Sequence, residues 1–292
     1  MIILCARIVL LAALLAGGTA SLQALSWAPG WTGPPATRAS PVTAADLTEA
    51  RRLGDAIDSA ASARAAIVAW EAVATAQPDQ PEAWIELATL RLLEGAAYRS
   101  RPKDRLKCYI AALQDCERAM ATNPGFLRRV REGQKPWEAV AALGPREMGA
   151  MNFWSTGVFY IFRDCLGLFG RITNVRLMDA AKAMLVRMDA VDPAWEEYVS
   201  TFSWGIYYLT MPSSRGGDKA RAREYFDLAV TRGVHRTLPR WGRAKYFLLP
   251  RGEAAAARAD LAAVVARELD GLGGNRSWNR YFQAEAARLL AP

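Results

Sequence analysis

Residues 112–124 read Ala-Leu-Gln-Asp-Cys-Glu-Arg-Ala-Met-Ala-Thr-Asn-Pro, and this stretch decides the fold. Ala112, Cys116 and Ala119 share one face of a predicted helix, which must end at Pro124 because proline cannot continue it. The same spacing recurs at Ala66-Trp70-Val73-Pro78, at Ala181-Leu185-Met188-Pro193 and, with Val234 in place of proline, at Ala222-Phe226-Ala229. A pattern written four times predicts tetratricopeptide-like helix pairs that stack into a superhelical bundle, with extra helices at the carboxy terminus.

Part of the tetratricopeptide pattern, Trp-x2-Leu-Gly-x2-Tyr, accompanies this spacing. Residues 84–91 keep the tryptophan and the leucine, but Ala88 replaces the glycine and Arg91 replaces the tyrosine. Residues 204–208 keep the glycine and the tyrosine. The stretch from Trp84 to Pro124 is longer than one unit needs, and the surplus predicts a connection over residues 95–104. The positions expected to pack the repeats are Ala66, Trp70, Trp84, Ala112, Cys116, Ala181, Leu185, Gly205, Ala222 and Phe226.

The periodicity of apolar residues predicts an all-α fold, because no stretch alternates long enough to form a strand. Asp46 or Thr48 is expected to cap the first helix. The apolar stretch 151–162 is bracketed by charged residues about 15 positions apart, fewer than the ~20 that a bilayer needs, and is predicted to be a buried central helix. The Arg-rich residues 128–135 are predicted to form a solvated loop. The helices are expected at about 46–58, 61–76, from 84, 112–122, 137–143, 151–162, 177–190, 196–210, 219–231, 241–248, 253–269 and 278–290.

The amino terminus is typical of an export signal. Arg7 precedes an apolar run over residues 8–16, and small residues follow it. We therefore expect a signal peptide over residues 1–25, with an uncleaved anchor as the alternative. A Pro- and Gly-rich linker is expected over residues 26–44, and one helical-repeat domain over 45–292.

Charge and composition argue against several classes of function. The chain has 37 basic and 29 acidic residues, a net charge of +8, but they are mixed along the helices and form no nucleic-acid-binding motif. Its one histidine, His235, lies in a predicted loop, which disfavours nucleophilic catalysis and zinc binding. No catalytic residue, metal or cofactor is predicted.

The cysteines that follow the leader are expected to be buried thiols. Cys108 and Cys116 lie about 12 Å apart along one predicted helix, too far for a disulfide. The pairing of Cys165 with either of them is the alternative.

The most specific motifs lie in residues 149–231. They are Phe153-Trp154-x2-Gly157, the Asp192-Pro193 stop, the run Gly205-Ile206-Tyr207-Tyr208-Leu209-x-Met211-Pro212, and a Gly216-Gly217-Asp218 loop that leads into Ala220-Arg221-Ala222-Arg223-Glu224-Tyr225-Phe226. With these motifs the chain resembles the TatT family, the tetratricopeptide-repeat T-components of TRAP transporters.

This resemblance implies a periplasmic, non-enzymatic protein that forms homotrimers and pairs with the solute-binding subunit of a TRAP transporter. It also implies an apolar channel toward the ligand cleft of that subunit. The chain departs from the family in lacking a lipoprotein cysteine after the apolar run. The alternative function is that of an envelope scaffold, unrelated to transport, which holds peptides or assembly factors in its repeat groove.

Aromatic side chains are the candidate site residues. Most such residues in a helical protein belong to the core, but some can line an apolar pocket or pore for a small hydrophobic ligand. The candidates are Phe153, Trp154, Phe159, Trp204, Tyr207 and Tyr208.

Overall fold

The structure, a computed structural model, describes residues 42–291. The predicted leader and residues 26–41 of the predicted linker lie outside this range. Every regular element between residues 42 and 291 is helical and no strand occurs there, which confirms the all-α prediction. None of the helices in this range is both long enough and apolar enough to cross a bilayer.

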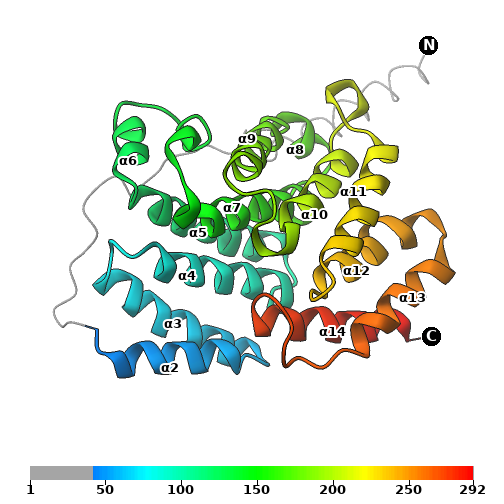
Figure 1. Cartoon of the computed structure of the whole chain (residues 1–292), viewed down its shortest axis with the longest axis horizontal. Helices are drawn as coiled ribbons and strands as arrows, with labels where there is room; N and C mark the ends of the chain where they lie inside the picture. Colours follow the sequence, from blue (N-terminus) through cyan, green and yellow to red (C-terminus); the bar gives the residue numbers. More distant parts are fainter. Residues whose placement is uncertain (1–41, 292) are drawn as a thin grey trace, which may run out of the picture.

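The α-helices follow one another as a chain of packed pairs (Figure 1). Their bounds are α2 (Ala44–Asp55), α3 (Ala60–Ala76), α4 (Pro81–Leu93), α5 (Pro102–Ala121), α6 (Pro124–Arg131), α7 (Met148–Tyr160), α8 (Leu168–Thr173), α9 (Arg176–Val191), α10 (Trp195–Thr210), α11 (Lys219–Arg232), α12 (Leu238–Gly242), α13 (Ala254–Val265) and α14 (Arg276–Leu290). Three π-helical turns extend α4, α7 and α12, namely η2 (Glu94–Tyr98), η5 (Ile161–Cys165) and η7 (Arg243–Leu248). Short 3-10 turns complete the connections at η3 (Val140–Ala142), η4 (Pro145–Glu147), η6 (Ser213–Arg215) and η8 (Leu249–Arg251).

The described chain closes on itself, because its last helix packs against its first (Figure 1). The Ser277 hydroxyl at the start of α14 donates to the Gly54 carbonyl in α2 at 2.5 Å. One turn later Arg280 donates to the Ile57 carbonyl at 2.5 Å. The helical-repeat bundle is therefore closed into a ring by this contact.

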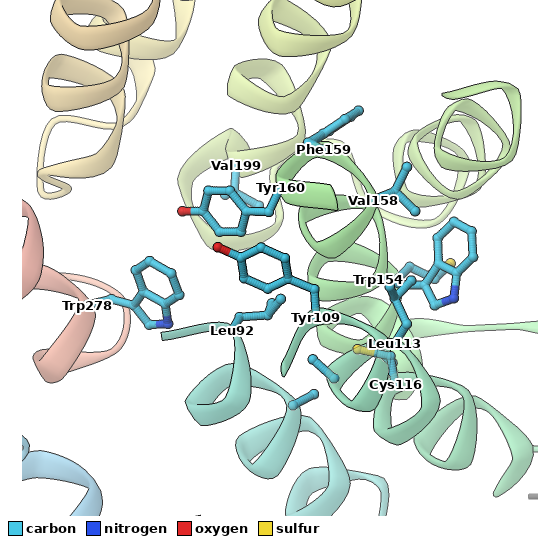
Figure 2. Packing of buried hydrophobic residues seen from close by; sticks show 14 of the residues in the cluster. Leu92, Tyr109, Leu113, Cys116, Trp154, Val158, Phe159, Tyr160, Val199 and Trp278 are labelled. Carbon is cyan, nitrogen blue, oxygen red and sulfur yellow. The ribbon is translucent and has the colours of Figure 1, made fainter. Parts of the chain in front are cut away.

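All ten positions expected to pack the repeats are buried. The α10–α11 pair shows why small residues recur there: a Cβ atom added at Gly205 would lie 2.9 Å from the ring of Phe226, closer than such atoms pack. The core between α4, α5, α7 and α14 is drawn in Figure 2, where Tyr109 stacks on Tyr160 with ring centroids 5.3 Å apart.

Arg91, which departs from the tetratricopeptide pattern, has a partner in the next helix. Its Nε lies 2.9 Å from a carboxylate oxygen of Asp115, a fully buried residue of α5. Arg118 approaches the other oxygen at 2.7 Å. The tyrosine of the pattern is replaced here by one member of a buried ion-pair network.

The first helix begins earlier than predicted. Thr43 is its cap, and neither Asp46 nor Thr48 serves in that role. The amide of Asp46 donates to the Thr43 hydroxyl at 3.2 Å, and the Asp46 carboxylate accepts from the Thr43 amide at 2.9 Å. This reciprocal capping box places Asp46 three residues inside the helix.

The loop prediction for residues 128–135 is wrong in its first half, because α6 runs to Arg131. Asn123 caps α6 by accepting from the amides of Gly125 and Phe126 at 3.0 and 3.2 Å. Phe126 and Val130 then bury one face of the helix. The arginines marked the exposed face of this short helix, and the two apolar residues were too few to show a period.

Other boundaries also differ. The connection expected over residues 95–104 begins as the π-turn η2 and gives way to α5 at Pro102. Residues 137–143 contain only the 3-10 turn η3, and the helix expected over 253–269 ends at Val265. The helix expected over 241–248 begins at Leu238 and continues as a π-turn, and α8 was not predicted at all.

Candidate functional site

The closed ring surrounds a cavity of about 1300 Å³. Its wall is contributed by α2, α3 and α4 on one side, by α7 and α10 on another, and by α12, α14 and the loop over residues 269–275 on a third. Because both ends of the described chain supply lining residues, the cavity depends on the contact between α2 and α14. It is larger than a typical pocket for a small molecule, which spans about 300–1,000 Å³.

Helix α7 presents one continuous stripe to the cavity. Asn152, Phe153, Thr156, Phe159 and Tyr160 line it, and their spacing of one, four, seven and eight residues from Asn152 is that of a single helical face. Leu113 of α5 packs against the opposite face of α7, where a Cβ atom at Gly157 would lie 3.3 Å from it. The helix therefore divides the core from the cavity.

Aromatic rings cover much of the wall. Tyr160 stacks on Trp278 with centroids 6.1 Å apart, and Trp241 meets Phe282 at 4.5 Å. The Trp278 indole donates to the Thr89 carbonyl at 3.2 Å, which fixes its ring against α4. The lining aromatics are Trp70, Phe153, Phe159, Tyr160, Trp195, Phe202, Trp241, Tyr246, Trp278 and Phe282.

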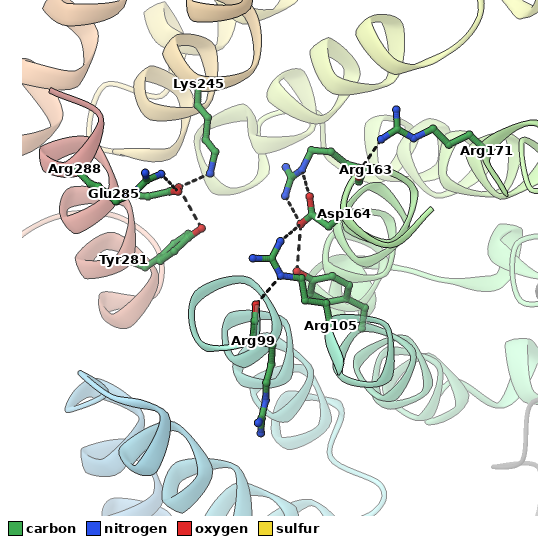
Figure 3. Close-up of polar contacts among 10 residues, drawn as sticks. Arg99, Arg105, Arg163, Asp164, Arg171, Lys245, Tyr281, Glu285 and Arg288 are labelled. Atoms are coloured by element: carbon green, nitrogen blue, oxygen red, sulfur yellow. Dashed lines mark hydrogen bonds and ion pairs between the residues drawn. The ribbon is translucent and has the colours of Figure 1, made fainter. Parts of the chain in front are cut away.

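Arg163 of the π-turn η5 lies at the aromatic wall. Its guanidinium is 4.6 Å from the ring centroids of both Tyr160 and Tyr246. The same group donates to Asp164 at 2.5 and 2.7 Å, so its charge is neutralised locally (Figure 3). Burial raises the pKa of the Tyr246 hydroxyl, so the phenol stays neutral beside this cation.

A second ion pair, also drawn in Figure 3, joins the carboxy-terminal elements η7 and α14. Lys245 lies 2.5 Å from Glu285, and the Tyr281 hydroxyl donates to the same carboxylate at 3.2 Å. These contacts hold η7 against α14. They therefore also position the aromatic rings of both elements that line the cavity.

The start of α10 has a strained backbone. Glu196, Glu197 and Tyr198 have φ values of 52°, 54° and 61°, in the left-handed region that costs an L-residue about 1–2 kcal/mol. Their side chains hold the segment in place: Glu196 pairs with Arg236, and Glu197 accepts from the His235 amide at 3.0 Å. Glu196 and Arg236 both line the cavity, so the strain lies in its wall.

Several polar atoms of the wall are buried without a hydrogen-bond partner among residues 42–291, namely the Asn152 side-chain oxygen, the Arg236 Nε, the Trp241 indole nitrogen and the Tyr246 hydroxyl. Asn152 is 7% exposed, and its side-chain oxygen accepts no hydrogen bond there. Glu86 of α4 is half-buried, lines the same cavity and makes no ion pair in this part of the chain. Burial, and then the negative charge of Asp55, raise the pKa of Glu86, while Arg51 lowers it.

The structure separates the six aromatic candidates. Phe153 and Phe159 line the cavity. Trp154 lies on the other side of α7, fully buried, and its indole donates to Glu117 at 2.9 Å.

Trp204, Tyr207 and Tyr208 do not line the cavity and instead gather on a different face of α10. The Trp204 indole donates to Asp189 of α9 at 2.7 Å, and the ring of Tyr208 lies 5.3 Å from that of Tyr225 of α11. These contacts hold three neighbouring helices together.

Sequence reasoning missed two polar residues of the wall, Asn152 and Glu86. Asn152 left a signal, since it is one amide inside an otherwise apolar stretch. Glu86 left none, because a glutamate on an amphipathic helix looks the same in sequence whether it faces solvent or a cavity.

The comparison with protein families gives one match. A family model described as TRAP transporter T-component matches residues 95–292, which is more than half of the chain. No curated protein matches the chain. The matched range includes α7, α10, α12 and α14, and therefore most of the cavity wall.

Proposed function

The chain belongs to the TRAP transporter T-component family, and on this premise we propose that it acts with the solute-binding subunit of such a transporter and receives a small solute in its central cavity. The family is one of transporter subunits rather than of enzymes. Membership of this family supports a role in TRAP transport. Within the molecule, the central cavity is the place that suits a solute.

The cavity is the observation that carries this proposal. Its wall combines ten aromatic side chains with charged and amide groups, a lining that suits a small molecule with an apolar body and a polar group. Arg163 and the strained start of α10, at Glu196, both lie in this wall.

The proposed location is the periplasm, reached through the signal predicted over residues 1–25. The proposed assembly is a homotrimer. Leu168, Phe169 and Ile172 of α8 are between 62% and 72% exposed, and such a group of apolar side chains suits a protein contact.

Affinity capture from the native envelope tests the partnership. We expect the tagged protein to recover the solute-binding subunit of a TRAP transporter. A matched variant replaces all three exposed side chains of α8 by serine, which leaves the buried core unchanged. Comparison with the parent shows whether the α8 surface contacts the solute-binding subunit. Recovery of no transport component would overturn the proposal, and retention of extended peptides without a small molecule would favour the scaffold alternative.

A further inference from the structure

We propose that the cavity selects a neutral solute with an apolar body, and that the Trp241 indole and the Tyr246 hydroxyl together donate hydrogen bonds to one carbonyl oxygen of that solute. This inference rests on the proposed function in one respect, namely that the cavity binds a solute. Two features of the wall support it, the balance of its charges and the kind of polar atoms that are buried there without a partner.

The arginines of the wall do not favour an anion. Three of the four are in ion pairs, namely Arg163 with Asp164, Arg236 with Glu196, and Arg276 with Asp270. The fourth, Arg51, has no ion pair in the described part of the chain, but it is exposed and lies close enough to Glu86 to favour the charged form of that carboxyl. An anionic solute would therefore meet no arginine of the described wall that is both buried and unpaired.

The carboxylates of the wall do not favour a cation either. Of the six among the described lining residues, three are in ion pairs and two more are exposed, in the order Glu82, Glu196, Asp270, Asp55 and Asp79. The sixth, Glu86, is half-buried with Arg51 nearby. A charged solute of either sign would lose its hydration without gaining a buried counterion, which is costly.

The buried polar atoms of the wall favour a solute that accepts hydrogen bonds. Four such atoms have no partner among residues 42–291, namely the Trp241 indole nitrogen, the Tyr246 hydroxyl, the Arg236 Nε and the Asn152 side-chain oxygen. Indole and guanidinium nitrogens can only donate, and a phenol can donate as well as accept. Three of the four can therefore be satisfied by an acceptor on the solute.

Trp241 and Tyr246 bring two of these donors to one corner of the cavity. They lie five residues apart where α12 continues into η7, and their ring centroids are 5.3 Å apart in an edge-on arrangement. Arg163 lies 4.6 Å from the Tyr246 centroid and has only donors, so it cannot accept the hydroxyl proton. A carbonyl oxygen has two lone pairs, which match these two donors.

Aromatic rings beside the two donors suit the apolar body of the solute. Phe282 meets Trp241 with ring centroids 4.5 Å apart, and Trp278 meets Phe282 at 5.4 Å. Both donor atoms are shielded from bulk solvent, so water competes little for a hydrogen bond made there. The rings alone would accept any apolar molecule, and the donors add the preference for an oxygen.

Four probes that share one carbon skeleton test the selection, namely benzylacetone, phenylbutylamine, phenylbutyrate and butylbenzene. Calorimetry and the quenching of tryptophan fluorescence would measure their binding to the purified protein at neutral pH. We expect the ketone, benzylacetone, to bind at least about tenfold more tightly than the amine and the acid, because both ions must be desolvated. Equal or tighter binding of either ion would overturn the inference. If none of the four bound, the premise that the cavity takes a solute would fail with it.

Variants locate the donors. Tyr246→Phe removes the hydroxyl and keeps the ring, so it should weaken benzylacetone by about tenfold, the loss of one hydrogen bond, and leave butylbenzene unchanged. The variant should fold like the parent, because the hydroxyl has no hydrogen-bond partner to lose within the described chain. Trp241→Phe should likewise weaken the ketone more than the hydrocarbon.

Tyr208→Phe is the matched control, since it is the same substitution on a tyrosine that does not line the cavity, and it should change neither affinity. An unaltered affinity of Tyr246→Phe for benzylacetone would overturn the assignment of the hydroxyl. These assays need no transporter subunit, so their failure is distinct from a failure of the capture experiment.

Discussion

The Nε of Arg91 on α4 lies 2.9 Å from the Oδ2 of Asp115 on α5, and Asp115 is fully buried. This ion pair joins two successive helices at a place where the repeat pattern has a tyrosine. Removing one partner of a buried pair leaves a charge without solvent or counterion.

We expect Arg91→Met to lower the free energy of unfolding by about 3 kcal/mol at pH 8, the lower end for a buried pair because Arg118 remains. Burial raises the pKa of Asp115 to about 6, so its carboxyl is ionised at pH 8 and increasingly protonated in the folded protein below pH 6. The penalty should therefore shrink at pH 5.

Denaturant titrations at both pH values would measure this. Arg101→Met is the control, since Arg101 is 80% exposed in its pair with Asp104 and should cost less than about 1 kcal/mol. A penalty that does not depend on pH would contradict the assignment to Asp115.

Gly205 is expected to tolerate no methyl group. Its missing Cβ would lie 2.9 Å from Phe226, so Gly205→Ala should destabilise the protein by about 1–3 kcal/mol through overpacking. Thermal unfolding would show the loss. Gly167→Ala, where nothing lies within 4 Å of the added atom, is the matched control. The double variant with Phe226→Leu should recover part of the loss if the clash is its cause.

The contact that closes the ring should control the opening of α2. Ser277→Ala with Arg280→Ala removes the hydrogen bonds to the Gly54 and Ile57 carbonyls, each worth about 1 kcal/mol. Hydrogen exchange should accelerate over residues 44–57 before it changes in α7. Arg288→Ala, on an exposed side of α14, should leave α2 protected, and equal exchange in both variants would argue against the closure.

Glu86→Gln should stabilise the protein near neutral pH. The pKa of Glu86 is raised in the folded state, so folding takes up a proton and this group costs stability as the pH rises above 4.5, its ordinary value. The glutamine variant does not pay this cost, and the two unfolding free energies should converge below that pH. A variant that is less stable than the parent at pH 7 would show that the carboxylate has a stabilising partner.

The thiols should react slowly in the folded protein. Burial raises the pKa of Cys108 to about 11 and that of Cys165 to about 12. At pH 8 iodoacetamide should label Cys108 roughly a hundredfold more slowly than an ordinary thiol, because the thiolate is the nucleophile. Peptide mapping by mass spectrometry would resolve each cysteine, and labelling in denaturant gives the reference rate. Rapid labelling of Cys116, which is fully buried, would contradict the packing of α5.

The sequence predicted the packing better than the site. Ala112, Cys116 and their counterparts repeat at a fixed interval because each helix pair meets in the same way, so the interval is visible in the chain. The closure of the ring has no such signal, since Ser277 meets a backbone carbonyl at Gly54 and any residue can supply a carbonyl. Without that contact the cavity could not be foreseen.

The aromatic candidates show a related limit. Phe153 and Trp154 are neighbours in sequence and lie on opposite sides of α7, one toward the cavity and one in the core. Which side of a doubly buried helix faces a hollow depends on elements far away in the chain, here α2 and α14, and not on the helix itself.

The bond between Ser277 and Gly54 also bears on how the protein is made. Ribosomes deliver the amino-terminal helices first, and most of the helix pairs can assemble before α14 exists. The cavity acquires its last wall only when the final helix arrives, so a chain that stops short of residue 276 would keep much of its helical content and lose the enclosure of its cavity.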